Sequence, residues 1–273
     1  MIKTVLYPLL ILCLILMVFL GAKAYAKALA YEAYTTELVT HQGVEEQAKR
    51  QLSKFAKSIL GDYYNDEKKV ELDKIRALQN YAMQEAQKYT YYFVGILFVV
   101  LLSYFLIPLR AFTIFGALSA MIALFFGLIA PILMVTIHKE VEYLGDIVLS
   151  FESKGVVGSI EKLWESGDIV VALVILIFSV IMPVLKIVSL LFVSVFMESR
   201  FAHGIVKFFK AIGKWSMVDV FVVAVFLVYL TANKGDVSRA EVEVGLYFFL
   251  AYVIVSMLVS LSADKMLHEN KVV

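Results

Sequence analysis

The chain has 273 residues, of which 61% are hydrophobic and 18% are charged, and its mean hydropathy is +0.83. Soluble domains are closer to half apolar and a quarter charged, so composition alone indicates a membrane protein. The formal net charge is +1, which gives no reason to expect nucleic-acid binding. The single cysteine, Cys13, excludes a disulfide within the chain and a cysteine-based zinc site.

The apolar segments predict an all-α integral membrane protein with about six transmembrane helices. A bilayer core of roughly 30 Å requires about 20 apolar residues in helical conformation. The segments that meet this requirement are about 5–22, 90–109, 112–137, 169–196, 216–232 and 244–262. We therefore divide the chain into two spans joined by a hairpin (1–110), a four-span module (111–265) and a tail (266–273).

The first apolar segment, "MIKTVLYPLLILCLILMVFLGAKAYAKA", has two interpretations. Its short basic start and the small residues Ala22, Ala24 and Ala26 are typical of a cleaved signal peptide. The apolar run from Thr4 to Ala22 is long for a signal peptide, which favours an uncleaved membrane anchor.

The distribution of lysine and arginine predicts the orientation of the spans. The loop after the fourth span, "ESRFAHGIVKFFKAIGK", has four basic residues against one acid and is expected in the cytoplasm. Segment 138–168 has seven acidic residues against three lysines and is expected outside. Because successive spans cross the membrane in opposite directions, both termini are then expected in the cytoplasm and residues 23–89 on the periplasmic side.

Residues 23–89 predict a helical hairpin that stands on the first two spans. One helix face carries an apolar stripe that leads into the second span and consists of Leu72, Ile75, Leu78, Ala82 and Ala86. Either such stripes only hold the two arms of the hairpin together, or the tip of the hairpin also docks a partner.

Segment 138–168 differs in character from the hairpin. "GDIVLSF" is compatible with a short strand, and "GSIEKLWESGD" predicts an amphipathic helix with Ile160, Leu163 and Trp164 on one face. Tryptophan is suited to the boundary between lipid and water. We interpret Trp164 as an interface anchor, with a role in gating a substrate as the alternative.

Two charged residues, Lys186 and Asp219, lie inside predicted spans. Each intramembrane charge costs roughly 2.5–3.5 kcal/mol on insertion scales. Lys186 either extends its side chain to the aqueous boundary, pairs with Asp219 as a structural ion pair, or belongs to a working polar site. Both residues fall in the cytoplasmic halves of their spans, so the two side chains are expected at compatible depths.

Other polar features accompany Lys186 along its span. Ser179 and Pro183 precede it by seven and three residues, which places all three on roughly one helix face. Pro183 has no backbone N–H, so the carbonyl of Ser179 loses its helical partner. Ser256 in the last span is expected at a similar depth. The sequence thus predicts a polar site that faces other helices rather than lipid.

Catalytic and metal-binding motifs are missing from the sequence. It contains no Ser/His/Asp set, phosphate-binding loop or zinc motif, and the four histidines have no metal-ligand spacing. We therefore expect a protein that is not an enzyme and that has no metal site or cofactor.

The polar residues lie in motifs that resemble a known family. "IGKWSMVDVFVVAVF" resembles the signature of the paraquat-inducible protein A family, and "SVIMPVLKIVSLL" is similar to its Ser-x-x-x-Pro-x-x-Lys stretch. "GSIEKLWESGD" and "VIVSMLVSLSADK" show weaker similarity, and together the motifs cover about residues 112–265. The residues that these motifs carry over are Ser179, Pro183, Lys186, Trp215, Ser216 and Asp219, while Ser256 falls where the family often has threonine.

The resemblance implies a multi-pass protein of the bacterial inner membrane. It implies an inner-membrane subunit of an envelope phospholipid transport system, with membrane lipids and an MCE-type periplasmic protein as partners. The chain departs from many members of this family, because it has one module, lacks cytoplasmic zinc ribbons and carries the extra hairpin at 23–89. A membrane sensor or scaffold with a periplasmic hairpin, or an ion-coupled transporter of small solutes, remains the alternative.

Overall fold

The computed structural model describes residues 2–41, 67–141, 145–195 and 238–269. Within these residues, five helical segments are long and apolar enough to cross a membrane. They are α1 (Ile2–His41), α3 (Glu67–Leu102), α4 (Leu109–Ile129), the continuous segment of α6 (Ile169–Ile175), η3 (Leu176–Ile181) and α7 (Met182–Val195), and α10 (Val244–Glu269). This confirms a helical multi-pass membrane protein, and the predicted span 216–232 lies outside the described residues.

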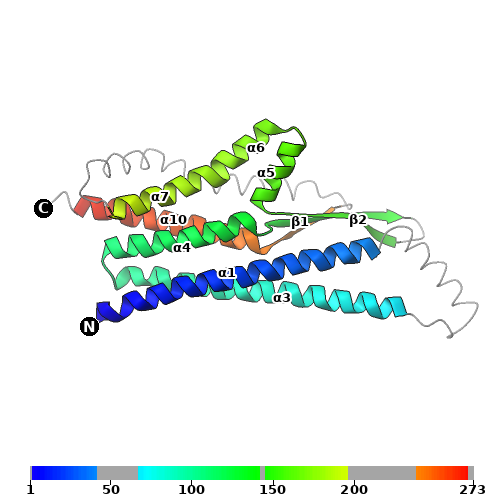
Figure 1. Ribbon diagram of the computed structural model, residues 1–273, viewed down its shortest axis with the longest axis horizontal. Helices are drawn as coiled ribbons and strands as arrows, with labels where there is room; N and C mark the ends of the chain where they lie inside the picture. The colour runs from blue at the N-terminus through cyan, green and yellow to red at the C-terminus, as the bar shows by residue number, and fades with distance from the viewer. Residues whose placement is uncertain (1, 42–66, 142–144, 196–237, 270–273) are drawn as a thin grey trace, which may run out of the picture.

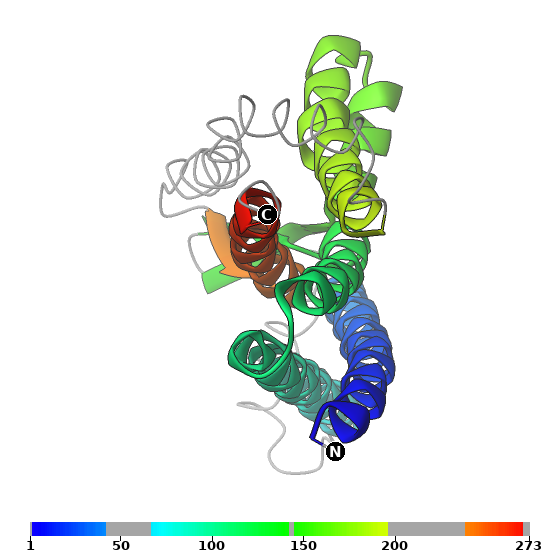
Figure 2. The same ribbon diagram turned by 90° about the vertical axis from the view of Figure 1, so that its left-hand side faces the viewer.

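The first four segments run alternately in opposite directions through one bundle, and α10 runs in the same direction as α6 and α7 (Figure 1). Figure 1 shows both ends of the described chain at the same end of the molecule. Tyr7 of α1 stacks on Phe115 of α4 with 6.1 Å between the ring centroids, and Gly21 further along α1 lies against the ring of Phe126 further along α4, so these two helices run parallel. Viewed along the bundle, α4 lies between α1 on one side and α7 on the other (Figure 2).

Helices α4 and α10 pack closely against each other. Small residues on α4 let the two backbones approach, as they do in many membrane helix pairs. A Cβ atom added to Gly127 would lie 2.8 Å from the backbone nitrogen of Phe249. The buried share of the apolar window is 61% for α4 and 56% for α10, against 17% for the span Ile169–Val195. The bundle core is therefore built around α4 and α10.

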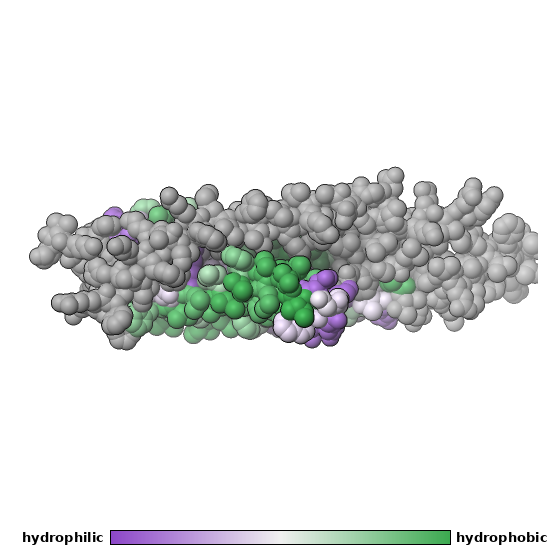
Figure 3. All heavy atoms as spheres, turned by 90° about the horizontal axis from the view of Figure 1, so that it is seen from above, coloured by the Kyte–Doolittle hydropathy of each residue, from purple (hydrophilic) through white to green (hydrophobic). Residues whose placement is uncertain are grey.

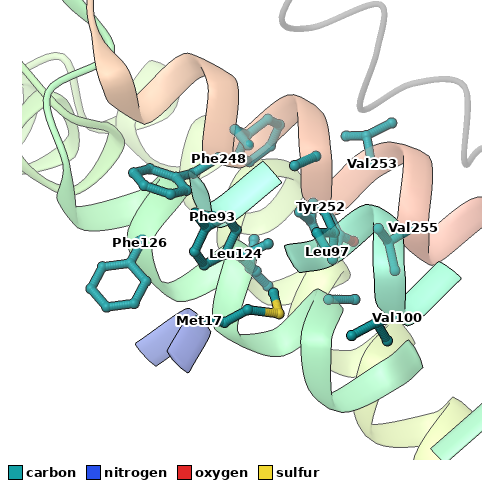
Figure 4. Close-up of a cluster of buried hydrophobic side chains, with 14 of the residues drawn as sticks. Met17, Phe93, Leu97, Val100, Leu124, Phe126, Phe248, Tyr252, Val253 and Val255 are labelled. Atoms are coloured by element: carbon teal, nitrogen blue, oxygen red, sulfur yellow. The ribbon is translucent and has the colours of Figure 1, made fainter. Parts of the chain in front are cut away.

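An aromatic cluster joins the N-terminal hairpin to this core (Figure 4). The ring of Phe93 on α3 meets Phe248 of α10 edge-on, with centroids 4.8 Å apart and planes at 89°. Phe93 also meets Phe126 of α4 edge-on at 6.5 Å. Such edge-to-face pairs are favoured by the ring quadrupoles. All three rings are almost completely buried, which fixes α3 against the module.

The predicted span at 112–137 is too long at its C-terminal end. Helix α4 ends at Ile129, and Pro131 follows two residues later. Strand β1 (Leu133–Val141) then begins and pairs antiparallel with β2 (Gly145–Lys154) and β3 (Ser238–Val242). The strand expected at "GDIVLSF" lies in β2, whereas no local pattern predicts β1 or β3.

The described arms of the predicted hairpin are continuous with the first two spans. Thr35 on α1 accepts a hydrogen bond from the amide of Gln79 on α3, at 2.8 Å. Ile75, Ala82 and Ala86 of the predicted stripe are buried, but Leu78 is 46% exposed. Most of the stripe therefore holds the two arms together as expected.

Candidate functional site

The span that carries Lys186 is locally widened just before that residue. Residues Leu176–Ile181 form a π-helical segment, η3, between α6 and α7. Pro183 cannot donate the backbone hydrogen bond that the carbonyl of Ser179 would receive in an α-helix, so a wider turn is a natural local solution. Pro183 is buried, and Ser179 is 7% exposed. Both therefore face the protein rather than the surface.

Lys186 is directed toward α10 across the interior of the bundle. Its Nζ donates a hydrogen bond to Oγ of Ser256, at 3.2 Å. Ser256 is 1% exposed, and its hydroxyl donates to the carbonyl of Val253 at 3.0 Å. Lys186 and Ser256, which are 70 residues apart in sequence, are therefore brought together in the structure.

Two sets of contacts place this pair near the middle of the length of the bundle. Arg110, in the first turn of α4, bonds to the carbonyl of Ser194. Lys186 precedes Ser194 by eight residues, so it lies about 12 Å along the axis from that end of the bundle. Gly116 of α4 faces Val259 of α10, and Gly127 of α4 faces Phe249. Ser256 lies between Phe249 and Val259 on α10, so it lies at the level of the centre of α4.

The direction of the Lys186 side chain bears on the three explanations for its charge. An extension to the aqueous boundary requires the ammonium to turn along the axis toward the end of the bundle. The contact with Ser256 instead keeps the ammonium at mid-depth. The geometry favours an interior polar contact, and a pairing with Asp219 remains a prediction because Asp219 lies outside the described residues.

The other predicted residues occupy two separate places. Trp164 lies on α5 (Val156–Glu165), a short helix that packs against α6 near the C-terminal end of α4, and its side chain is 54% exposed. It does not share the site of Lys186. Trp215 and Ser216, like Asp219, lie outside the described residues.

Sequence reasoning missed one polar residue near the pair. Tyr252 precedes Ser256 by four residues, so it lies on the same face of α10, and it is completely buried. Figure 4 shows its side chain in the cluster between α3 and α10. The i, i+4 spacing from Ser256 was the available signal, but a tyrosine in an apolar run is usually a packing residue.

The span with Lys186 also presents a large apolar surface on its other side. Val170, Val174 and Val188 are between 48% and 76% exposed. Seen from the side of α6 and α7, apolar residues gather in one patch that hydrophilic residues border (Figure 3). This surface suits contact with acyl chains, because an exposed apolar face on a transmembrane span is in contact with lipid. Within the described ranges, no three His, Cys, Asp or Glu side chains are grouped to hold a metal ion.

Comparison with known proteins gives one family and one relative. The family described as paraquat-inducible protein A matches residues 112–269, more than half of the chain. A protein of Haemophilus influenzae named "probable intermembrane transport protein" is 28% identical over 109 residues. The match covers 38% of this chain and 26% of that relative, so this chain spans about a quarter of the relative's length. No solved structure matches the chain.

Proposed function

The chain belongs to the paraquat-inducible protein A family, and from this we propose that it is a membrane subunit of an envelope phospholipid transport system. The observation that carries the proposal is the hydrogen bond between Lys186 and Ser256 at mid-membrane depth. A cation at this depth is costly and usually marks a substrate or ion pathway. The name of the Haemophilus influenzae relative supports transport between membranes rather than catalysis.

In the proposed mechanism, the ammonium of Lys186 attracts the phosphate of a lipid headgroup into a polar cleft formed by the last three spans. Ser256 holds the ammonium in place when lipid is absent and offers its hydroxyl to the headgroup when lipid enters. The apolar surface of α6 and α7 receives the acyl chains. The widened turn at Ser179 and Pro183 supplies a backbone carbonyl that lacks its usual helical donor.

Asp219 completes the proposal on the basis of sequence alone. Its carboxylate would hold Lys186 when ionised and release it when protonated, which would couple lipid movement to a proton. Trp215 and Ser216 belong to the same motif, and we assign them to the cytoplasmic boundary of that span. We also propose that both termini lie in the cytoplasm of a bacterial cell, with the protein in the inner membrane.

We further propose that the hairpin and the outer sheet face an MCE-type periplasmic protein. Helices α1 and α3 continue past the outer end of α4, which is marked by Pro131, and carry paired side chains such as Thr35 and Gln79. These arms stand on the side where a periplasmic lipid conduit would dock.

A comparison of two lysine variants tests the transport proposal. Wild type, Lys186→Met and Lys265→Met are purified in nanodiscs, and retained phospholipid is measured by mass spectrometry beside lipid transfer between vesicles. Lys265 is an exposed lysine on α10 and serves as the matched control. We expect loss of retained lipid and of transfer in Lys186→Met only. Normal transfer by folded Lys186→Met would overturn the proposal.

A further inference from the structure

Positive charge gathers where the two arms of the hairpin enter the bundle. The charged residues in 17–31 of α1 and 80–102 of α3 are Lys23, Lys27, Glu85 and Lys88. These stretches therefore carry three lysines and one acid, whereas the chain as a whole has a net charge of only +1. They also lie outside the part of the chain that the family matches, which is 112–269.

Lys27 reaches from α1 to α3. Its Nζ lies over the ring of Tyr81 on α3, 5.0 Å from the ring centroid. Its positive charge also acts on the carboxylate of Glu85. Tyr81 and Glu85 are four residues apart, so they lie on one face of α3. An aromatic ring and a carboxylate of α3 thus hold an ammonium group that belongs to α1.

Lys88 approaches the same carboxylate from the next turn of α3. Its Nζ donates a hydrogen bond to Oε1 of Glu85 at 3.1 Å. The side chain of Lys88 is 52% exposed, against 16% for that of Glu85. An ammonium group has three N–H donors, so Lys88 can donate to a further acceptor while it keeps this bond. Glu85 therefore brings together two lysines from two helices.

The level of Lys27 in the bundle is that of the membrane boundary. Gly21 of α1 lies against the ring of Phe126 of α4, and the two helices run parallel. Lys27 follows Gly21 by six residues and so lies about 9 Å beyond Phe126, whereas α4 ends only about 4.5 Å beyond it, at Ile129. Because α4 has 21 residues, which is just enough to cross the hydrocarbon core, Lys27 lies at headgroup depth.

The surroundings of Lys88 indicate the same depth. Gln87, the residue before it, lines a small cavity together with Val244, which is the first residue of α10. One turn further along α3, Tyr91 and Tyr92 are 63% and 54% exposed. Exposed tyrosines are typical of the boundary between lipid and water. Both lysines are therefore placed where the phosphates of membrane lipids lie.

The balance of charge at this place favours one class of headgroup. The ammonium groups of Lys27 and Lys88 outnumber the single carboxylate beside them, and Lys23 adds a positive charge one turn away on α1. In a zwitterionic headgroup an attached ammonium offsets the phosphate. A headgroup without a cation, such as that of phosphatidylglycerol, keeps its negative charge and accepts charge-assisted hydrogen bonds from lysine.

We propose that Lys27 and Lys88 bind the phosphate of a phospholipid with a net negative headgroup, at the membrane boundary on the side of the sheet. The site requires only that α1 and α3 cross a membrane, so it stands apart from the transport proposal. It also differs in place from Lys186, which lies at mid-depth. It gives the hairpin a role in selecting the lipids that surround the protein.

Headgroup competition in nanodiscs tests the proposal. The full chain is reconstituted with equal amounts of phosphatidylglycerol and phosphatidylcholine that have the same acyl chains, and the lipids retained after extraction are measured by native mass spectrometry. We expect a glycerol-to-choline ratio about fivefold above the input, the factor that one lysine near an anionic surface provides. The double variant Lys27→Gln/Lys88→Gln should return the ratio to the input, and a wild-type ratio in this variant would overturn the proposal.

Two single variants separate lipid binding from the packing of α1 against α3. Glu85→Gln keeps an acceptor for Lys88 but removes the competing negative charge, so the ratio should rise, and a fall would overturn the proposal. Lys74→Gln removes an exposed lysine about 21 Å from Lys88 along α3 and should leave the ratio unchanged. A charge cluster that only ties α1 to α3 would lower the melting temperature of Glu85→Gln and of the double variant and leave the ratio unchanged, which would also overturn the proposal.

Three further measurements identify the ligand and separate the two proposals. About 1 M salt shortens the Debye length to about 3 Å, so the wild-type ratio should fall toward the input, and a ratio that salt does not change would overturn the proposal. Inorganic phosphate added to phosphatidylcholine nanodiscs should not raise the melting temperature. A rise that the double variant loses would assign the lysines to free phosphate and overturn the lipid site. Lys186→Met should lose lipid transfer but keep the ratio among the lipids that remain, so either proposal can fail without the other.

Discussion

Arg110 at the start of α4 holds the end of α7 through the backbone of Ser194. Its Nε donates to the carbonyl of Ser194 at 2.9 Å, and its second guanidinium nitrogen donates to the carbonyl of Val195 at 3.0 Å. These carbonyls lie at the C-terminal end of the described part of α7. The arginine therefore ties α7 to α4 at the end that lies opposite the sheet.

Replacement of Arg110 by alanine should loosen α7 near Val195. Two charge-assisted hydrogen bonds are lost, and we expect about 1–2 kcal/mol less stability together with faster amide exchange in Met182–Val195. Hydrogen–deuterium exchange in detergent measures the effect. Arg76→Ala, which removes an exposed arginine 4.0 Å from Asp73, is the control and should leave exchange in α7 unchanged. Equal amide exchange of α7 in both variants would contradict the role of Arg110 in holding α7 against α4.

Replacement of Gly127 by alanine should separate α4 from α10. The added Cβ would lie 2.8 Å from the backbone nitrogen of Phe249, and a backbone atom cannot move aside as a flexible side chain can. We expect a loss of about 1–3 kcal/mol, measured as a lower midpoint of denaturant unfolding. Gly95→Ala adds the same methyl group in α3, where nothing lies within 4 Å, and should be neutral or slightly stabilising. A similar midpoint for both variants would show that α4 and α10 are not in close contact.

The helices can be predicted from the sequence because their apolar stretches are long. The strands cannot be predicted in this way, because they form by pairing between segments that are distant in the sequence. The span expected at 112–137 extends too far toward the C-terminus, because "ILMVTI" after Pro131 is as apolar as a membrane-spanning helix. Only pairing with β3 reveals it as a strand, with Leu133 opposite Val242. Strand pairing over more than 100 residues leaves no local signal.

The contact between Lys186 and Ser256 could be anticipated because both are polar residues at similar depths in apolar spans. The burial of Glu243 could not be anticipated from the sequence in the same way. Glu243 follows a charged stretch and precedes a span, so in sequence it resembles an ordinary exposed acid at a helix start. Its burial depends on the position of Gly245 against the end of α4.

Replacement of Pro183 by alanine should restore a regular α-helix in the span that carries Lys186. Alanine supplies the N–H that the carbonyl of Ser179 lacks, so the six-residue π-helical segment η3 is expected to shorten. A turn of α-helix contains fewer residues than a turn of π-helix, so this change rotates Ser179 about the helix axis relative to Lys186. We expect less lipid transfer at an unchanged or higher melting temperature. Pro8→Ala, inside α1 at an exposed position, is the control. Unchanged transfer by Pro183→Ala would show that the wide turn has no part in transport.

Replacement of Ser256 by alanine tests the contact on which the transport proposal depends. The ammonium of Lys186 loses the hydroxyl that accepts its hydrogen bond at 3.2 Å, and a hydrogen bond to a charged group contributes about 1.5–3 kcal/mol. We expect lipid retention to fall about tenfold, in proportion to that cost. Ser262→Ala is the matched control, because Ser262 is also buried on α10 and its hydroxyl donates to the carbonyl of Leu258 within the same helix. If both serine variants lower retention equally, the loss reflects α10 itself. If only Ser256→Ala does so, and Lys186→Met in combination adds nothing further, the two residues act as one unit, as coupled partners in a double-mutant cycle should.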